Sequence, residues 1–255
     1  MKARSQSSST PKETSRKLPS PKPERPKWTC AEVLSELRVL GTQCNVDGMA
    51  RFGIRAKIVY GVPKPKMDVL AYEIGRDHAL ALQLWDTGVH DARILAGMID
   101  LPAQVTAAQM DRWVRDFDNW DVCDGTCCHL FVFAKPAWEK AIAWSKRPKE
   151  FEKRAGFALM AYLAYRDKFA SDSKYLRLFP MIRRDACDER NFVRKAVNWA
   201  LRQIGKRNLK LNAAAIREGE RIRKLDSRAA RWIAADALRE LQSAAVQTRL
   251  RRKKK

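Results

Sequence analysis

The residues best suited to chemistry lie in the stretch DNWDVCDG, which spans positions 118–125. Three aspartates and a tryptophan occur here in a chain that is otherwise strongly basic. We expect Asp118 to be the N-cap of a helix with Asp121 three residues later, because both carboxylates can then serve free backbone amides and the positive end of the helix dipole. Asp124 lies beyond the capping positions. It follows Trp120 by four residues, so these two side chains project from one helix face.

An indole beside a carboxylate has two interpretations. A surface aspartate next to a half-buried tryptophan is common in folded proteins. Alternatively, Asp124 faces a cationic centre, and Gly125 leaves open space next to it. DNA contains such a centre when a purine is alkylated on a ring nitrogen, which makes the base a good leaving group. Its excision then requires stabilisation of an oxocarbenium-like sugar, and a carboxylate provides this electrostatically while it positions the attacking water.

A second candidate surface lies on the helix that we expect over residues 192–204. At roughly 100° per residue, one stripe of this helix collects the apolar side chains that should face the core, namely Val193, Ala196, Val197, Ala200, Leu201 and Ile204. Trp199 lies off this stripe, four residues after Lys195 and three before Arg202. An aromatic ring between two cations suits contact with a sugar-phosphate or a base. The alternative is a tryptophan packed against the neighbouring helical pair, with both cations merely solvated.

The composition points to an anionic partner. The 255 residues include 51 Lys and Arg but only 29 Asp and Glu, which gives a formal net charge of +22. Nucleic acid is the usual partner of such a chain. The alternative is a generic basic protein, such as a ribosome-associated factor. Hydrophobic residues make up 45% of the chain, which is ample for a packed core.

The sequence gives no reason to expect a membrane protein, because no apolar run is long enough to cross a bilayer. The N-terminal region lacks the apolar segment of a secretory signal. We therefore expect a cytoplasmic protein, associated with the nucleoid if the source is bacterial. In such a reducing compartment the six cysteines should be thiols rather than disulfides.

The motif CDGTCCH raises the question of a metal site, because it contains Cys123, Cys127, Cys128 and His129. Its spacing is not that of a CxxC ligand pair, and adjacent cysteines on a helix point about 100° apart. We interpret these cysteines as small core residues. We expect no metal and no other cofactor.

The chain divides into three segments by composition. Residues 1–27 are rich in Ser, Pro, Lys and Arg and cannot bury enough apolar surface to offset their ordering entropy, which predicts a disordered basic arm. Residues 28–245 are predicted to form a single domain, and residues 246–255 a basic C-terminal tail. Both terminal segments should add sequence-independent attraction to phosphates.

Helical periodicity dominates the central segment. In TAAQMDRWVRDF, Thr106 and Gln109 have capping-box spacing and an apolar stripe follows. Similar patterns predict helices in HDARILAGMIDLP, FEKRAGFALMAYLAYRDKF and RNFVRKAVNWALRQIG, the last closed by Gly205 as a C′ residue. Only KIVYGV, around residue 57, alternates as a strand would. Helices joined by short Pro- or Gly-marked turns predict an all-α stack of helical pairs.

Six blocks between about Gly48 and Gly205 carry a resemblance to a known family. They are GMARFGI, YGVPKP, LWDTGVHDARILAGMI, WVRDFDNWDVCD, EFEKRAGFALMAYL and FVRKAVNWALRQIG. In this order they resemble the AlkD-type DNA alkylation repair glycosylases. The resemblance implies tandem HEAT-like antiparallel helical pairs that form a curved superhelical solenoid with a basic concave face. It also implies excision of N3-alkyladenine and N7-alkylguanine from duplex DNA without turning the base into an enclosed pocket.

The resemblance also implies roles for particular residues. The catalytic aspartate of the family falls on Asp124, and its two tryptophans fall on Trp120 and Trp199. Its phosphate-binding arginines match Arg154, in FEKRAGF, and Arg202, in NWALRQ.

We therefore expect a monomeric DNA glycosylase that acts on double-stranded DNA containing alkylated bases, with Lys195 as a further DNA contact. The rival hypothesis is a non-catalytic helical-repeat protein that grips the backbone of DNA or RNA. Asp124 speaks against it, because a pure phosphate binder gains nothing from an acid in its basic groove. A third hypothesis, a scaffold for acidic proteins, does not explain why Trp199 lies between two cations.

Overall fold

The computed structural model describes residues 27–252, so nearly all of the predicted arm 1–27 lies outside the described residues. Its helices, in chain order, are α1 (Cys30–Leu40), α2 (Gln43–Arg51), α3 (Lys64–Ile74), α4 (His78–Asp86), α5 (His90–Ile99), α6 (Ala107–Arg115), α7 (Trp120–His129), η1 (Phe131–Phe133), α8 (Ala137–Trp144), α9 (Glu150–Arg166), α10 (Asp172–Leu176), α11 (Phe179–Asp185), α12 (Asn191–Gly205), α13 (Leu209–Arg223), α14 (Arg228–Leu241) and α15 (Ala244–Arg252). No strand occurs among the described residues, and the prediction of an all-α fold is confirmed. None of these helices combines the length and apolarity that a membrane span requires.

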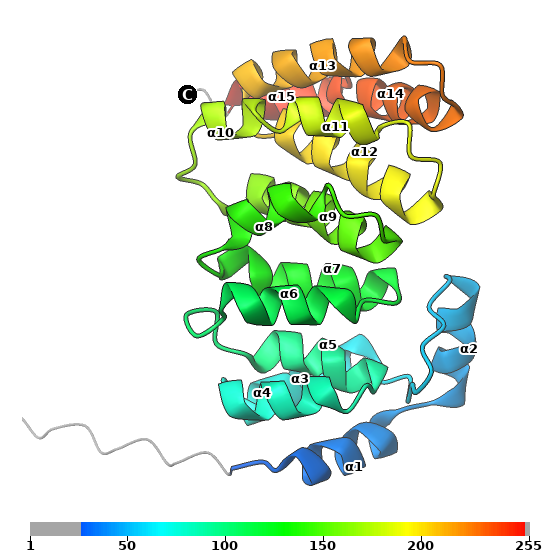
Figure 1. The fold of residues 1–255 in the computed structure, drawn as a ribbon, viewed down its shortest axis with the longest axis vertical. Helices are drawn as coiled ribbons and strands as arrows, with labels where there is room; N and C mark the ends of the chain where they lie inside the picture. Colours follow the sequence, from blue (N-terminus) through cyan, green and yellow to red (C-terminus); the bar gives the residue numbers. More distant parts are fainter. Residues whose placement is uncertain (1–26, 253–255) are drawn as a thin grey trace, which may run out of the picture.

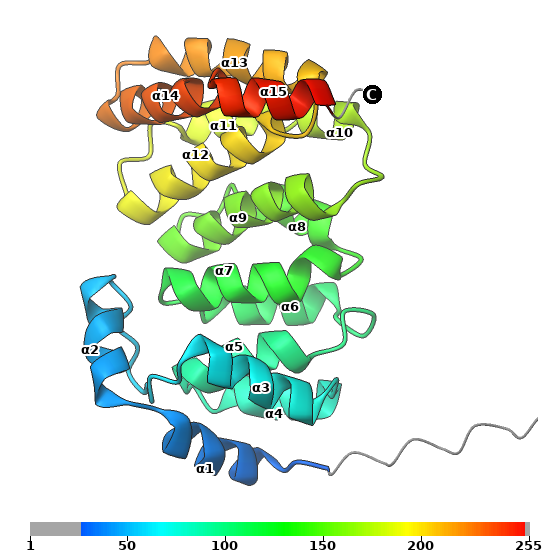
Figure 2. The same cartoon turned by 180° about the vertical axis from the view of Figure 1, so that it is seen from behind.

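Antiparallel helical pairs are stacked along the long axis of the molecule (Figure 1). The pairs α4–α5, α6–α7, α8–α9, α11–α12 and α13–α14 each place one helix in an outer row and one in an inner row. The inner helices α5, α7, α9, α12 and α14 pack successively on one another. Helix α2 stands beside this stack in both views (Figure 2).

The core between the two rows is built from the predicted apolar stripes. Trp85 of α4 and Trp113 of α6 are fully buried and stack with ring centroids 3.9 Å apart. Thr106 caps α6 by accepting a hydrogen bond from the Gln109 amide, as predicted. The Gln109 side chain, however, donates to Asp100 at 2.7 Å rather than returning to the cap, so only half of the capping box forms. The stripe that follows this cap is buried as expected, at Met110, Trp113, Val114 and Phe117.

The segment between α2 and α3 contains KIVYGV but forms no strand. The buried carboxylate of Asp91, in α5, explains its course. It accepts hydrogen bonds from the backbone amides of Tyr60 at 2.7 Å and Val62 at 2.8 Å. Gly61, between them, has a φ of 75°, a left-handed conformation that favours glycine. Asp91 therefore fixes the loop between α2 and α3, and this loop places α2 beside the stack of helical pairs.

The C′ role predicted for Gly205 is wrong. Gly205 is the last residue of α12, and Lys206 is the C-cap. A Cβ on Gly205 would come within 2.6 Å of Leu241 Cδ2 and 2.9 Å of Ala215 Cβ. The glycine therefore permits the close approach of α12, α13 and α14. Its function depends on tertiary packing, which a local C-terminal signal does not report.

The predicted C-terminal tail, 246–255, begins inside a helix. Helix α15 extends to Arg252, and Val246 and Leu250 are only 7% and 1% exposed. The helix packs on α14. Up to Arg252 this segment therefore belongs to the helical stack, and residues 253–255 lie outside the described part.

Candidate functional site

Helix α7, which carries the acidic stretch, begins one residue later than predicted. Asn119 is its N-cap, because the Asn119 side-chain oxygen accepts hydrogen bonds from the amides of Asp121 and Val122 at 3.0 and 3.1 Å. Asp118 is exposed, and its carboxylate accepts a 2.6 Å hydrogen bond from the Asn119 side chain. The N-cap role predicted for Asp118 is therefore wrong. Asn and Asp cap helices about equally well, and the chain uses the second of two suitable neighbours.

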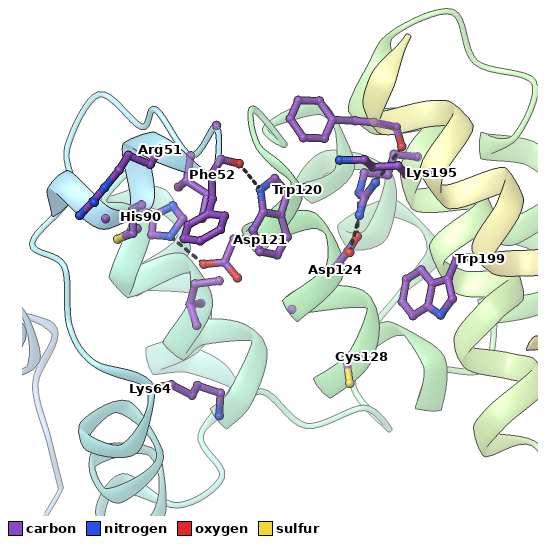
Figure 3. Close-up of a pocket in the computed structure, with 18 of the residues that line it drawn as sticks. Arg51, Phe52, Lys64, His90, Trp120, Asp121, Asp124, Cys128, Lys195 and Trp199 are labelled. Carbon is purple, nitrogen blue, oxygen red and sulfur yellow. Dashed lines mark hydrogen bonds and ion pairs between the residues drawn. The ribbon is translucent and has the colours of Figure 1, made fainter. Parts of the chain in front are cut away.

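Trp120 and Asp124 lie on the same face of α7, as predicted, and both line a large cleft. The cleft has a volume of about 1560 Å³ and collects side chains from α2, α3, α5, α7, α9, α12 and α14. Figure 3 shows Asp124 between Trp120 and Trp199, with one indole on each side of the carboxylate. Gly125 also lines the cleft, but a Cβ there would lie 3.3 Å from Ile94 Cδ1. Gly125 therefore allows the close approach of Ile94, in α5, and the open space predicted beside Asp124 is partly filled by this side chain.

Asp124 forms a bidentate ion pair with Arg154 of α9. Arg154 Nε donates to Asp124 Oδ1 at 2.9 Å, and Nη2 donates to Oδ2 at 2.6 Å. Arg154 Nη1 donates to the carbonyl oxygen of Phe192, in α12, at 2.7 Å. The Asp124 and Arg154 side chains are only 16% and 8% exposed. The guanidinium thus joins three inner helices around one carboxylate.

The environment of this pair shifts the pKa values of both groups. Burial raises the pKa of the Asp124 carboxyl above its ordinary value, and the charge and hydrogen bonds of Arg154 oppose that rise. Burial acts to lower the pKa of Arg154, but the charge of Asp124 and its hydrogen bonds with the guanidinium, with smaller contributions from Cys123 and Cys127, together raise that pKa. Arg154 is therefore the group that keeps negative charge on a largely buried carboxyl.

Trp199 lies off the buried stripe of α12, as predicted, and the six residues of that stripe are all buried. Its half-buried ring packs edge-on against Tyr162 of α9, with centroids 4.8 Å apart and an interplanar angle of 82°. Burial, together with the charge of Asp124, raises the pKa of Tyr162. Trp199 thus packs on a neighbouring helix and lines the cleft at the same time.

The three residues predicted to contact DNA, Lys195, Arg202 and Arg154, differ in whether an acidic side chain of the protein already pairs with them. Lys195 is exposed in the cleft and forms no ion pair with any residue of the described range. Arg202 donates to Glu240 of α14 at 2.6 Å and lies 3.5 Å from Asp236. Arg154 binds Asp124. Contacts of Arg154 and Arg202 with phosphate therefore stay predictions, and each would have to coexist with an internal ion pair.

Four further aromatic residues that line the cleft were not predicted from the sequence: Phe52, Tyr162, Phe192 and Trp232. Trp232 is 38% exposed on α14, and Arg194 lies 5.2 Å from its ring centroid. Only half of the criterion that singled out Trp199 applies to it: Trp232 lies off the buried stripe of its helix and follows Arg228 by four residues, but Asp236 rather than a cation lies four residues after it. Phe52 has no such local signal. It reaches the cleft from the end of α2, where its carbonyl accepts a hydrogen bond from Trp120 Nε1 at 3.0 Å.

Each acid that lines the cleft binds a neighbouring group. These acids are Asp91, Asp121, Asp124 and Asp236. Asp91 accepts hydrogen bonds from backbone amides, Asp121 pairs with His90, and Asp124 pairs with Arg154. Asp236 accepts a hydrogen bond from Asn198 and pairs with Arg202 and Arg239. Among residues 27–252, no three His, Cys, Asp or Glu side chains are grouped so that they could hold a metal ion.

The model of the DNA alkylation repair enzyme family matches residues 33–241. The chain belongs to this family. A solved structure shares the fold with a TM-score of 0.72 and 21% sequence identity, over 88% of this chain and 96% of that one. It is described as a new family of proteins related to the HEAT-like repeat DNA glycosylases with affinity for branched DNA structures. The predictions of the family and of a HEAT-like helical fold are confirmed. No curated protein matches the chain.

In this DNA alkylation repair family member, we expect Lys195→Ala to weaken binding to damaged and undamaged duplex alike, because a phosphate contact carries no lesion-specific information. The slope of log affinity against log salt concentration should decrease by about 1. Fluorescence anisotropy titrations at several salt concentrations measure both quantities. Arg202→Ala is the comparison, since it removes a charge that Glu240 already offsets and should change the slope less. A loss confined to damaged DNA would contradict the phosphate role of Lys195.

Proposed function

We propose that this protein is a DNA glycosylase that hydrolyses the N-glycosidic bond of cationic N3-alkyladenine and N7-alkylguanine in duplex DNA. The position of Asp124 carries the proposal. Its carboxylate lies at the wall of the cleft between Trp120 and Trp199. Membership of the DNA alkylation repair enzyme family agrees with this function.

The proposed role of Asp124 concerns charge that moves as the bond breaks. An N3- or N7-alkylated purine already carries a positive charge and leaves as a neutral base, so the reaction needs no general acid. The electron deficiency passes to C1′ of the sugar, where a carboxylate stabilises it and orients a water molecule for attack. Trp120 and Trp199 offer aromatic faces to the cationic base or sugar.

Arg154 has the geometry to serve Asp124 and DNA together. A guanidinium carries five N–H donors. Two of them bind the carboxylate of Asp124 and one binds the carbonyl of Phe192. The other two donate to no group in the part of the chain that the structure describes, and Arg154 lines the cleft, so a phosphate oxygen that reaches them would leave the ion pair intact. We therefore infer that Arg154 positions the catalytic carboxylate while it contacts the DNA backbone.

A second function, DNA-backbone binding without excision, has two observations in its favour. The ion pair with Arg154 offsets the charge of Asp124, as a purely structural bridge between α7 and α9 would. The protein of similar fold is described as having affinity for branched DNA structures.

An excision assay distinguishes the two functions. We expect the protein to release 7-methylguanine and 3-methyladenine from methylated duplex DNA, detected as free base by chromatography. Unmethylated duplex of the same sequence should bind but release nothing. Binding of methylated DNA with release no faster than in buffer alone would leave backbone binding as the better function.

A further inference from the structure

A group of exposed aromatic and cationic side chains surrounds the C-terminal end of α9. Phe133 is 52% exposed, Tyr165 is 57% exposed and Phe169 is 100% exposed. Arg166 lies over the rings of both Phe133 and Tyr165, at 5.7 and 5.2 Å from their centroids. We call this group the α9 edge, and it consists of Phe133, Tyr165, Arg166, Lys168 and Phe169.

Hydrogen bonds to Asp167 and from Arg207 fix the backbone of the loop that carries Phe169. The carboxylate of Asp167 accepts hydrogen bonds from the amides of Phe169 at 3.1 Å and Ala170 at 2.8 Å, and from Trp138 Nε1 at 2.9 Å. Arg207 donates to the carbonyls of Asp167 at 2.8 Å and Ala170 at 3.4 Å. The backbone that exposes Phe169 is therefore preorganised, which lowers the entropic cost of binding a partner there.

The charge of the α9 edge is positive. Arg166 and Lys168 both lie against Tyr165, the Lys168 ammonium at 5.1 Å from the ring centroid. Asp167 is the one acid in the segment 165–170, and its carboxylate is bound by backbone amides and an indole. Exposed aromatic side chains beside cations suit a nucleic acid strand, whose bases stack on rings and whose phosphates attract cations. An acidic protein segment would use the cations but not the three exposed rings.

The α9 edge adjoins the cleft, because Tyr162, which lines the cleft, precedes Arg166 on the same helix by four residues. Arg154, which binds Asp124 deeper along α9, precedes Arg166 by twelve residues, or about 18 Å along the helix axis. That length equals roughly five nucleotide steps of one DNA strand. The connection that follows α9 lies on the side of the stack away from α2 (Figure 2). A strand that leaves a duplex bound in the cleft therefore has a path along α9 to this edge.

We propose that the α9 edge binds the unpaired bases of a single-stranded arm that leaves duplex DNA held in the cleft. Bases inside an intact duplex are covered by their neighbours, whereas bases in an unpaired arm have open faces that can stack on Tyr165 and Phe169. This inference rests on the binding of DNA in the cleft but not on excision.

The test compares two undamaged DNAs with the same paired sequence, one blunt-ended and one with splayed unpaired arms. The parent protein should bind the splayed DNA more tightly. The double variant Tyr165→Ala, Phe169→Ala should lose at least about 5-fold in affinity for splayed DNA, because removal of even one base stack costs about 5- to 150-fold. Its affinity for the blunt duplex should stay close to that of the parent. Tyr165→Phe keeps the ring, is the matched control, and should behave as the parent does.

A 2-aminopurine in the arm reports stacking directly, because stacking quenches its fluorescence. Quenching should occur with the parent and with Tyr165→Phe but not with the double variant. An equal loss of affinity on both DNAs, or no loss on either, would overturn the proposal, and the second result would favour a protein partner at this edge. Both substituted side chains are exposed, so circular dichroism should show a native fold. Undamaged DNA makes the result independent of whether the protein excises bases.

Discussion

Asp124→Asn should release 7-methylguanine and 3-methyladenine roughly 100- to 1000-fold more slowly than the parent in single-turnover assays. The substitution preserves the shape of the side chain and removes the charge that would face the oxocarbenium-like sugar. Loss of a preorganised electrostatic contact of this kind costs on the order of 3–4 kcal/mol. A cationic base leaves readily by itself, so we expect the measured loss near the lower end of this range.

Asp118→Asn is the matched control for this prediction. Asp118 is exposed and accepts one hydrogen bond from the Asn119 side chain, so its charge should not affect excision. Affinity for undamaged duplex should hold or rise in Asp124→Asn, because an anion leaves the cleft. If Asp124→Asn folds normally and excises at the parental rate, the catalytic assignment is wrong and backbone binding is the better function.

The parts of this site that the sequence predicts are properties of single helices. Four-residue spacing places Trp120 and Asp124 on one face of α7, and an apolar stripe sets Trp199 apart from the core of α12. The N-cap shows the limit of such patterns. Asp118 and Asn119 are equally good caps, and tertiary contacts decide between them: Asn119 is fully buried, 3.3 Å from His90.

Contacts between helices escape any local pattern. The ion pair of Asp124 and Arg154 joins residues 30 positions apart, and the hydrogen bond from Trp120 to Phe52 joins residues 68 positions apart. The family resemblance implies that Arg154 contacts a DNA phosphate. The position of an arginine in the sequence does not show which anion its guanidinium binds. The structure shows the partner, Asp124, and this contact supports the positioning role that we propose for Arg154.

Arg154→Gln should lower the free energy of unfolding by about 3–5 kcal/mol. The side chain is 8% exposed and binds both Asp124 and the carbonyl of Phe192. Its removal leaves a largely buried carboxylate without a countercharge. Urea denaturation monitored by circular dichroism measures the change. Arg202→Gln is the control, because its more exposed pair with Glu240 should contribute only about 0–1 kcal/mol. Equal stability losses in the two variants would contradict this account of the Asp124 pair.

Arg154→Gln should also move the pH dependence of excision. Burial raises the pKa of Asp124 and Arg154 opposes the rise, so the pKa should rise further in the variant. In the proposed mechanism excision requires ionised Asp124, and the acidic limb of the single-turnover rate should therefore shift to higher pH, while Arg202→Gln leaves it in place. The free energy of unfolding should also depend on pH in this range. Because folded Asp124 has a raised pKa, the folded state binds the proton more tightly than the unfolded chain does. The free energy of unfolding should therefore fall as pH rises from the ordinary aspartate pKa through the raised pKa. An acidic limb at the parental pH would show that Arg154 does not set the charge of Asp124.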